Sequence, residues 1–410
     1  MIWPTVLAVA FSFFYLMNTQ NPPPSAAFHS TRRSFLQATG AALAAPLLVS
    51  ATAGEPRKIK VGLIGCGSVS RMYLPHLAAS PWVELVSVCD IIPERAQQQA
   101  ERFKVPHQYA SLDQMLAGAS FELLVNTTDM QEHGRLNRQA IMAGKNIWSE
   151  KPMATTVADA QELLDLAKTK GVRLWGAPTV VNSPAFQFMA KTLAAGGLGR
   201  VAAAHAHYGH EGPNWSAFFY QKNGGSLPDL GVYNLTSLTG LLGPAKSVVA
   251  MTSIVTPTRE ITGRGTVEVT EEDNAMILLD HGQGVISHIQ CGFNYFNPHG
   301  HEGRNEQRHT LSIVGTQGAM GLVGYDWEPG GVELATPQNP EFKRFAIEQN
   351  GYRWEEGASV AAECLATGRE PLFTAAHAVH VCEIMIAARE SQASGRRIPL
   401  QTTFQWPVVS

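Results

Sequence analysis

A glycine-rich turn between a short apolar run and an amphipathic segment restricts the fold of this chain more than any other sequence feature. The apolar run covers residues 60–64, the turn is Gly65-Cys66-Gly67-Ser68-Val69-Ser70, and residues 69–77 carry apolar side chains at helical spacing. A strand that passes through a tight glycine turn into a helix is the first half of a β-α-β unit, whose strands pair in parallel. The turn therefore predicts an α/β fold at the start of the folded chain.

The same alternation of strands and helices continues to about residue 177. Further buried strands are expected at residues 82–89, 121–127 and 146–149. Amphipathic segments lie between them, and a further helix is opened by Thr156 with Asp159 three residues on and closed by Gly171. We therefore expect residues 54–180 to form a Rossmann domain with a doubly wound parallel sheet.

The rhythm changes after residue 181. A helix is expected over residues 185–195, and the last long helical segment covers residues 358–395. Strands separated by turn-rich segments are expected at residues 200–208, 275–279, 284–292, 309–314 and 319–323. This pattern predicts a second α/β domain, residues 181–410, with a large, mostly antiparallel open sheet.

The amino-terminal segment, residues 1–53, has the features of an export signal. Arg32-Arg33 is followed by an apolar run at residues 41–49 and by the small-residue site Ala51-Thr52-Ala53. This order is typical of twin-arginine signals and predicts a periplasmic or other extracytoplasmic location. The earlier apolar stretch, residues 2–17, is marginal for a membrane span, which leaves open an amino-terminal anchor or a translation start at Met17.

Composition excludes several classes of function. Beyond residue 53 the chain has 29 of its 31 basic residues against 34 acidic ones, a net formal charge of −5, so a nucleic-acid surface is not expected. The five cysteines form no CxxC pair, which argues against a zinc ribbon or a redox motif and predicts buried thiols.

The glycine turn is suited to a dinucleotide, because a helix N-terminus attracts pyrophosphate. The residues expected to contact the cofactor there are Gly65, Cys66, Gly67, Ser68 and Val69. Asp90 closes the next strand, where a carboxylate binds the ribose hydroxyls of NAD, although Arg95 leaves NADP open. Thr127, Thr128 and His133 follow a later strand and would lie over the cofactor, with a structural loop and a helix start as the alternatives.

A catalytic group is expected at Glu150-Lys151-Pro152, directly after the strand at residues 146–149. Ligands bind at the carboxyl ends of strands in open α/β sheets, and a residue before proline favours extended backbone. Asp229 and Tyr233 share one helix face at spacing i, i+4, so a carboxylate and a phenol would enter the same space as the Lys151 ammonium. The alternative is a helix cap followed by a packed tyrosine.

A polar and aromatic cluster follows in the second domain. It contains His205, His207, Tyr208, His210, Asn214 and Trp215. Because no carboxylate accompanies the His-x-His pair, we expect no metal site and assign Tyr208, His210, Asn214 and Trp215 to substrate binding, with Trp215 stacked on a sugar ring. Glu271-Glu272-Asp273 is expected to be a solvated turn.

In this order, Gly65-x-Gly67, Asp90, Glu150-Lys151-Pro152 and Asp229-x-Gly231-x-Tyr233 resemble the glucose-fructose oxidoreductase, inositol dehydrogenase and rhizopine-catabolism (Gfo/Idh/MocA) family. The resemblance implies that Lys151 touches cofactor and the reacting hydroxyl, that Asp229 orients the sugar and that Tyr233 exchanges the proton. It also implies a homo-oligomer built through the C-terminal sheet. Tyr233 stands where many members have His, and Thr128-Asp129-Met130 replaces the usual Thr-Pro-Asn.

These features lead to one principal hypothesis and two alternatives. The principal one is an NAD(P)-dependent oxidoreductase that acts on a sugar, polyol or glycoside, with a tightly bound cofactor recycled between substrates. The first alternative is an NAD-dependent glycoside hydrolase or lyase that oxidises the sugar transiently. The second is a non-catalytic sugar-binding protein, against which the combination of Lys151, Asp229 and Tyr233 argues.

Overall fold

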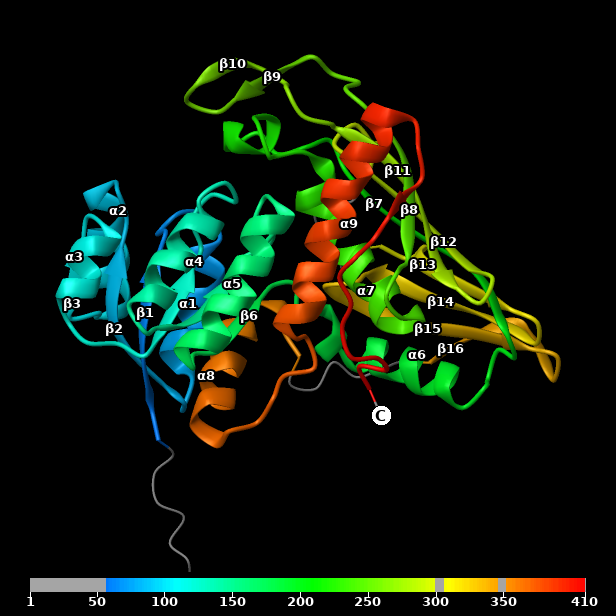
Figure 1. Ribbon diagram of the computed structural model, residues 1–410, viewed down its shortest axis with the longest axis horizontal. Coiled ribbons are helices and arrows are strands. Elements are labelled where there is room, and N and C mark those ends of the chain that lie inside the picture. Colours follow the sequence, from blue (N-terminus) through cyan, green and yellow to red (C-terminus); the bar gives the residue numbers. More distant parts are fainter. Residues whose placement is uncertain (1–56, 299–305, 346–351, 410) are drawn as a thin grey trace, which may run out of the picture. The chain divides into compact units, whose positions relative to one another are not determined.

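The computed structural model describes residues 57–298, 306–345 and 352–409, which belong to one compact unit of the chain (Figure 1). The predicted export signal, the apolar stretch before it and the alternative start at Met17 lie outside the described residues. Among the residues described, none of the helices combines the length and the apolar character that a membrane span requires.

The first sheet is fully parallel, as the alternating pattern predicted. Its six strands have the order β3-β2-β1-β4-β5-β6. They are β1 (Ile59–Ile64), β2 (Val83–Cys89), β3 (His107–Tyr109), β4 (Leu123–Asn126), β5 (Asn146–Ser149) and β6 (Leu174–Gly176). Strands β4 and β5 are almost wholly buried, which explains why they have continuous apolar runs instead of alternation.

Five helices connect these strands. They are α1 (Ser70–Ala79), α2 (Pro93–Phe103), α3 (Leu112–Ala117), α4 (His133–Met142) and α5 (Val157–Lys170). The predicted cap of α5 is present, because the Thr156 side chain accepts a hydrogen bond from the Asp159 backbone N–H at 3.0 Å. Gly171 ends the helix with a left-handed φ of 66°.

The second sheet has nine strands in the order β16-β15-β14-β13-β7-β12-β11-β8-β17. All its pairs are antiparallel except β7 with β12. The strands are β7 (Val201–Gly209), β8 (Ser247–Ser253), β11 (Asn274–Gly282), β12 (Val285–Gly292), β13 (His309–Gly315), β14 (Gly318–Tyr325), β15 (Glu328–Thr336), β16 (Asn339–Phe345) and β17 (Ile398–Pro399). A separate hairpin pairs β9 (Thr258–Ile261) with β10 (Gly265–Glu268). The two-domain α/β architecture is thus confirmed.

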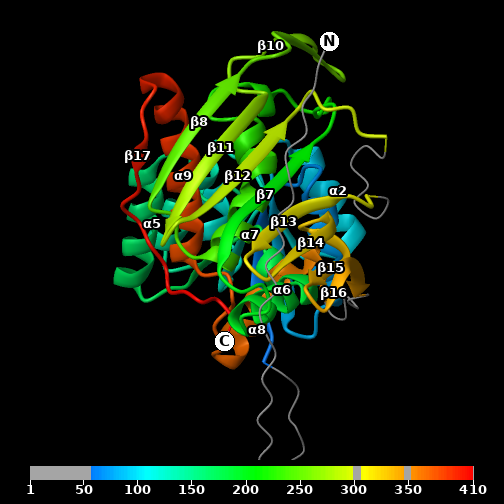
Figure 2. The same cartoon turned by 90° about the vertical axis from the view of Figure 1, so that its right-hand side faces the viewer.

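Helices cover one face of the second sheet. Figure 2 shows strands β8, β11, β12 and β7 in front of α7 (Val232–Leu242) and α9 (Ala375–Ser394), while α6 (Pro184–Ala194) packs beside α7. The covered face is apolar and buried, and the opposite face exposes side chains such as Met251 and Ile286. Only one face of this sheet is therefore occupied by the chain's own described helices.

The single helical segment predicted for residues 358–395 is wrong, because the structure has two helices there. Gly368 ends α8 (Gly357–Thr367) in a left-handed conformation, and α9 begins only at Ala375. Helix α8, orange in Figure 1, packs in the core of the first sheet with Ile59 and Trp148. A glycine inside an apolar helical pattern thus marks a chain reversal between two different cores.

The cysteines behave as predicted. All five thiols are free and buried. Burial raises the pKa of the Cys66 thiol to about 12, so this side chain is a neutral apolar group beside the glycine turn.

Candidate active site

The carboxyl ends of β1, β4 and β5 meet the start of α7 at a hollow of about 380 Å³. It is lined by Gly67, Ser68, Val69, Met72, Thr127, Thr128, Asp129, Met130, His133, Glu150, Lys151, Trp215, Phe218, Phe219, Asp229, Tyr233 and Trp354. The structure thus brings together most of the residues that the motifs had selected from four distant parts of the sequence. The described residues contain no group of three or more His, Cys, Asp or Glu side chains placed to hold a metal ion.

A nearly buried ion pair forms the centre of this hollow. The Lys151 ammonium donates to the Asp229 carboxylate Oδ1 at 2.6 Å and to the Asp229 backbone carbonyl at 2.7 Å. Its side chain is 12% exposed, and that of Asp229 is 14% exposed. Burial alone would lower the pKa of Lys151, but the charges of Asp229 and Glu150 raise it above its ordinary value. Lys151 is therefore held as an ammonium between the two domains.

Glu150 supports the backbone of Lys151. Its carboxylate accepts from the Tyr73 hydroxyl at 2.5 Å and from the Lys151 N–H at 2.9 Å. Tyr73 lies on α1, directly after the glycine turn, and no motif indicated its role because it follows the apolar periodicity of that helix. The contact ties the dinucleotide loop to the catalytic strand end.

Tyr233 lies beside the ion pair, with its ring centroid 5.1 Å from the Lys151 Nζ. Burial, with the nearby carboxylates of Glu150 and Asp229, raises the pKa of Tyr233 well above its ordinary value. The phenol is consequently neutral and is a proton donor at neutral pH. The ammonium and the phenol together present two donors to a substrate oxygen.

Asp229 lies on a π-helical turn, Leu227–Gly231, that leads directly into α7. Single π-turns of this kind are frequent at functional sites. The Asp229 carboxylate binds Lys151, and no described side chain caps the first turn of α7. This geometry favours the catalytic interpretation of the Asp229 and Tyr233 pair over the helix-cap alternative.

The glycine turn fits a dinucleotide. Gly65 has a φ of 90°, and a Cβ there would lie 2.6 Å from the Thr127 backbone, whereas a Cβ on Gly67 would meet nothing within 4 Å. Within the described chain, α1 has neither a capping side chain nor an acidic residue in its first turn. The N–H groups of Arg71 and Met72 donate to the Ser68 and Val69 carbonyls at 3.2 and 3.0 Å, so a pyrophosphate would bind at the N–H groups of the turn that precede them.

Asp90 has a second role that the sequence did not predict. Its carboxylate accepts from the Cys66 N–H at 2.7 Å and from the Ile92 N–H at 2.8 Å. These bonds fix the glycine turn to the end of β2, where a ribose would lie. Gly65, Cys66 and Asp90 do not line the hollow itself, because they form the floor of the turn behind Gly67.

Thr127, Thr128 and His133 all line the hollow, and each is also bonded to the surrounding backbone or side chains. The Thr127 hydroxyl donates to the Gly65 carbonyl at 2.7 Å, and the Thr128 hydroxyl donates to Asn126 Oδ1 at 2.7 Å. His133 begins α4, and its ring nitrogens lie 2.7 Å from the Pro152 carbonyl and 2.9 Å from that of Thr128. His133 thus begins a helix and also lines the hollow, and its contact with the cofactor stays a prediction.

Of the six residues predicted to contact the substrate, Trp215, Asp229 and Tyr233 line this hollow, whereas Tyr208, His210 and Asn214 do not. His210 is 1% exposed and its Nδ1 accepts from the Gly212 N–H at 2.9 Å. Asn214 is exposed and its carbonyl accepts from the Thr262 N–H at 2.7 Å. Of the polar and aromatic cluster at residues 205–215, Trp215 alone lines the hollow among the described residues.

Strand alternation divides the cluster between the two faces of the second sheet. Tyr208 points to the helix-covered face of β7, where its ring lies 5.9 Å from that of Tyr233. His205 and His207 point to the opposite face, and the Nδ1 of His205 lies 2.7 Å from the Nδ1 of His288. Side chains that are adjacent in sequence are thus separated by the sheet.

The prediction of a solvated turn at Glu271-Glu272-Asp273 is also wrong. Glu272 is 6% exposed and Asp273 is fully buried. Asp273 accepts from the backbone N–H groups of Val255 and Thr256 at 2.6 and 3.0 Å. Burial raises the pKa of Glu272 to about 7. A run of acids looks solvated in sequence, although backbone donors from distant segments can bury it.

An aromatic wall completes the hollow. Phe218 and Phe219 lie 4.0 Å apart, and Trp215 meets Phe219 edge-on at 5.6 Å. Gln131, from the first domain, donates to the carbonyls of Phe218 and Lys222 at 3.0 and 3.1 Å. The sequence analysis missed this wall, although the aromatic density of residues 215–220 was a usable signal.

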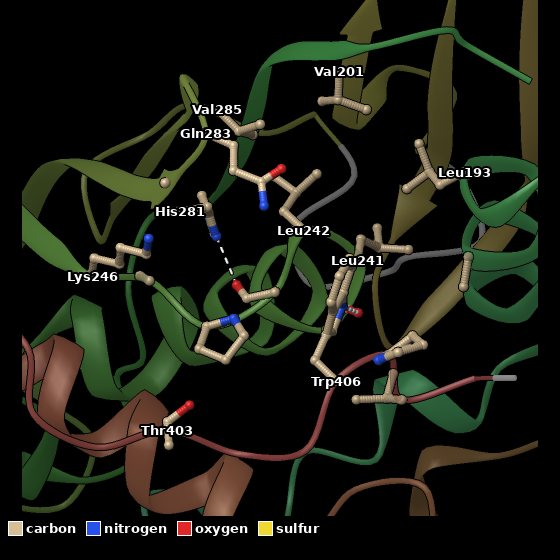
Figure 3. Close-up of a pocket in the computed structure, with 18 of the residues that line it drawn as sticks. Leu193, Val201, Leu241, Leu242, Lys246, His281, Gln283, Val285, Thr403 and Trp406 are labelled. Carbon is tan, nitrogen blue, oxygen red and sulfur yellow. Dashed lines mark hydrogen bonds between the residues drawn. The ribbon is translucent and has the colours of Figure 1, made fainter. Parts of the chain in front are cut away.

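A larger cavity of about 880 Å³ lies elsewhere in the second domain, beside the C-terminal segment (Figure 3). Its walls are mainly apolar, and none of its described lining residues is acidic. His281 points into it, but its Nδ1 lies 2.7 Å from the Gly243 carbonyl and its Nε2 lies 2.9 Å from the Ser287 hydroxyl. The cavity therefore lacks the converging proton donors and acceptors of the smaller hollow.

Comparisons with known proteins agree with this assignment. Residues 59–177 match a family model described as an oxidoreductase family with an NAD-binding Rossmann fold, and residues 186–321 match a GFO/IDH/MocA C-terminal domain. D-apiose dehydrogenase of Paraburkholderia graminis is 26% identical over 87% of this chain and 93% of its own length. Trans-1,2-dihydrobenzene-1,2-diol dehydrogenase of Mus musculus is 25% identical over 81% and 96%.

Solved structures share the fold. A levoglucosan dehydrogenase in complex with NADH and levoglucosan has a TM-score of 0.73 at 21% identity, covering 84% of this chain and all of its own. The WlbA dehydrogenase from Bordetella pertussis, in complex with NADH and UDP-GlcNAcA, has a TM-score of 0.70 at 23% identity, covering 84% and 99%. At these identities the likeness shows the architecture.

Proposed function

Because this chain belongs to the Gfo/Idh/MocA oxidoreductase family and has its NAD-binding Rossmann domain, we propose that it transfers hydride between NAD and a carbinol or carbonyl carbon of a sugar, polyol or glycoside. The observation that carries the proposal is the buried Lys151–Asp229 pair beside the Tyr233 phenol, at the open end of the dinucleotide turn. Among relatives, D-apiose dehydrogenase and levoglucosan dehydrogenase are named for carbohydrate substrates, which supports this substrate range.

Bound NAD supplies or accepts the hydride. Lys151 and Tyr233 hold the substrate oxygen by hydrogen bonds, and in the reducing direction either gives a proton to the developing alkoxide. In the oxidising direction the hydroxyl proton leaves to Lys151 as Lys151 passes its own proton to Asp229, at the 2.6 Å contact. Asp229 is then the final acceptor, and the ammonium is restored.

The direct test is to release and identify what the purified protein carries, and then to measure turnover. We expect mass spectrometry to detect NAD or NADP after denaturation, and we expect a panel of sugars, polyols and glycosides to change the NADH absorbance. The proposal would be overturned if no member of the panel reacted, either with the nucleotide that the protein carries or with added NAD or NADP.

We propose further that the protein is exported by the twin-arginine route with its cofactor already bound. Arg32-Arg33, the apolar run at residues 41–49 and the site at residues 51–53 support this. Free nicotinamide nucleotides are scarce outside the cytoplasm, so a retained cofactor recycled between two substrates suits such a location. A lysine pair in place of Arg32 and Arg33 is expected to keep the protein in the cytoplasmic fraction, whereas unchanged fractionation would contradict the proposed route.

A homo-oligomer through the second sheet also forms part of the proposal. On the face opposite α7 and α9, Met251 is 76% exposed and Ile286 is 51% exposed, and Met276, Leu278 and Val314 are nearly half exposed beside them. An open apolar sheet face of this kind is typical of an association surface. Light scattering should detect a dimer or tetramer, and Met251→Asp with Ile286→Glu should reduce it to monomers.

A further inference from the structure

The charges around the substrate end of the hollow are unbalanced. Among the described lining residues, Lys151 is the single lysine or arginine, whereas Asp129, Glu150 and Asp229 are carboxylic. Lys151 is already committed to Asp229 at 2.6 Å. Among the described residues that line the hollow, a carboxylate or phosphate on the substrate would meet no further lysine or arginine and would lie near like charges.

Aromatic and other apolar side chains form a large part of the remaining lining, which also includes Ser68, Thr127, Thr128 and His133. Trp215, Phe218, Phe219 and Trp354 line the same hollow, together with Met72 and Met130. Trp215 is 47% exposed while its edge contact with Phe219 holds the ring in place. Fixed aromatic rings gain most from a ligand that covers them with apolar surface, such as the C–H face of a pyranose or an aglycone.

The aromatic wall is held in place from across the domain junction. Gln131, two residues before His133 on the first domain, donates hydrogen bonds from its side-chain amide to the carbonyls of Phe218 and Lys222. The wall and the cofactor turn are therefore fixed relative to each other. This arrangement gives the apolar surface a defined distance from the reacting Lys151 and Tyr233.

From these two observations we infer that the substrate is an uncharged ring with an apolar face, a neutral glycoside or cyclic polyol, and that uronates, sugar phosphates and sugar nucleotides are excluded. This inference rests on the proposed oxidoreductase function. It goes beyond that function because nothing in hydride transfer itself requires a neutral or apolar-faced substrate.

The first experiment uses pairs that differ only in charge, with NAD-loaded protein. Glucose is compared with glucuronate, galactose with galacturonate, and phenyl β-D-glucoside with phenyl β-D-glucuronide, by calorimetric binding and by NADH formation. We expect the neutral member of a pair to bind at least about tenfold more tightly, and the phenyl glycoside to bind more tightly than the free sugar. Equal or tighter binding of the charged members would overturn the inference.

The two readouts separate the two ideas. Preferential binding of neutral members without NADH formation would contradict the proposed function and leave the substrate class standing. NADH formation that is fastest with the charged members would support the proposed function and contradict the inferred substrate class. Failure of every member to bind would contradict both.

A tryptophan pair offers matched variants. Trp215 lines this hollow and Trp406 lines the larger cavity, and both are 47% exposed. We expect Trp215→Ala to raise the KM for the phenyl glycoside about tenfold with a smaller change in kcat, and Trp406→Ala to change neither. Equal effects from the two variants, or none from Trp215→Ala, would contradict the stacking role.

A variant that introduces a positive charge tests the electrostatic part of the inference. Trp215→Arg places a cation at the wall and removes the apolar ring. The ratio of kcat/KM for neutral over charged substrate is then expected to fall by at least about tenfold. Trp406→Arg serves as the control with the same net charge, and an unchanged ratio in the Trp215 variant would overturn the role assigned to charge.

Discussion

The two hollows differ in volume and in chemical character, and the smaller one contains the converging ionisable groups. The cavity beside the C-terminal segment has about 880 Å³ and the one at the domain junction about 380 Å³. In the larger one, the ring nitrogens of His281 both have partners and the described walls hold no acid. In the smaller one, an ammonium, a carboxylate and a neutral phenol converge. Convergence of proton donors and acceptors at strand ends identifies the reactive site better than size does.

The assignment of chemistry to the smaller hollow can be tested directly, because some side-chain types occur in both hollows. Each is lined by a lysine and by a tryptophan, and each has a glutamine at or near its wall. A substitution in the smaller hollow thus has a partner substitution in the larger one. If paired variants behaved alike, the assignment of chemistry to the smaller hollow would be wrong.

The largest effect is expected from Lys151→Ala. Removal of the ammonium takes away the proton donor and leaves the Asp229 carboxylate without its partner, so we expect kcat to fall about 10³-fold. Lys246→Ala, in the larger cavity, should leave the steady-state kinetics unchanged because its side chain is exposed. Circular dichroism checks that both variants are folded, and full activity of folded Lys151→Ala would refute the mechanism.

A smaller loss is expected from Tyr233→Phe, about 10²-fold in kcat, because one of two proton donors to the substrate oxygen is removed. The raised pKa of Tyr233 keeps the phenol protonated, so the loss should stay constant between about pH 6 and pH 9. Tyr208→Phe is the matched control, since that ring lies 5.9 Å away outside the hollow. A comparable loss in Tyr208→Phe would return Tyr208 to the substrate site.

Gln131→Ala is expected to change only the position of the aromatic wall, without removing a group that contacts the reacting atoms. It removes the two hydrogen bonds that fix residues 218 and 222, so the aromatic wall loosens and KM rises about tenfold with little change in kcat. Gln401→Ala, whose exposed side chain lines the larger cavity, should leave KM unchanged. A fall in kcat without a change in KM would place Gln131 in the chemistry instead.

Local sequence signals predicted the first domain well. The turn at Gly65 and Gly67, the cap at Thr156 and the strand before Lys151 each depend on neighbouring residues, and the structure has all three elements. The second sheet was harder, since β15 contains Pro329, Gly330 and Gly331, which resemble a turn in sequence. Its parallel β7–β12 pair joins segments more than 75 residues apart, with no local signal.

The site shows the same division. Lys151, Asp229 and Tyr233 belong to short motifs, so their types and spacing were enough to select them. The bonds from Asp90 to the turn, from Tyr73 to Glu150 and from Gln131 to the aromatic wall depend on long-range packing. The burial of His210, which directly follows β7 and does not line the hollow, likewise depends on packing that its neighbours in sequence do not indicate.

The smallest effect concerns the wall of the larger cavity, which is built on neutral imidazoles instead of an ion pair. His380 on α9 is fully buried, and its Nε2 accepts from the N–H of Ala245, a lining residue. Burial lowers the pKa of His380 from 6.5 to about 4, although the nearby Glu383 opposes this and His281 reinforces it. His377, on the same helix, also has a lowered pKa because of burial.

A histidine with a lowered pKa binds its proton more readily in the unfolded chain. Its contribution to stability is therefore present above about pH 6.5 and is lost as the pH falls toward 4. We expect His380→Gln, which keeps an acceptor for Ala245, to lose about 1 kcal/mol less unfolding free energy than the wild type between pH 7 and pH 5.5. Urea unfolding at a series of pH values measures this difference. If the unfolding free energies of the variant and the wild type changed with pH in parallel, His380 would not be held neutral in the folded protein. The electrostatic contrast between the neutral histidines beside the larger cavity and the ion pair of the smaller one would then be wrong.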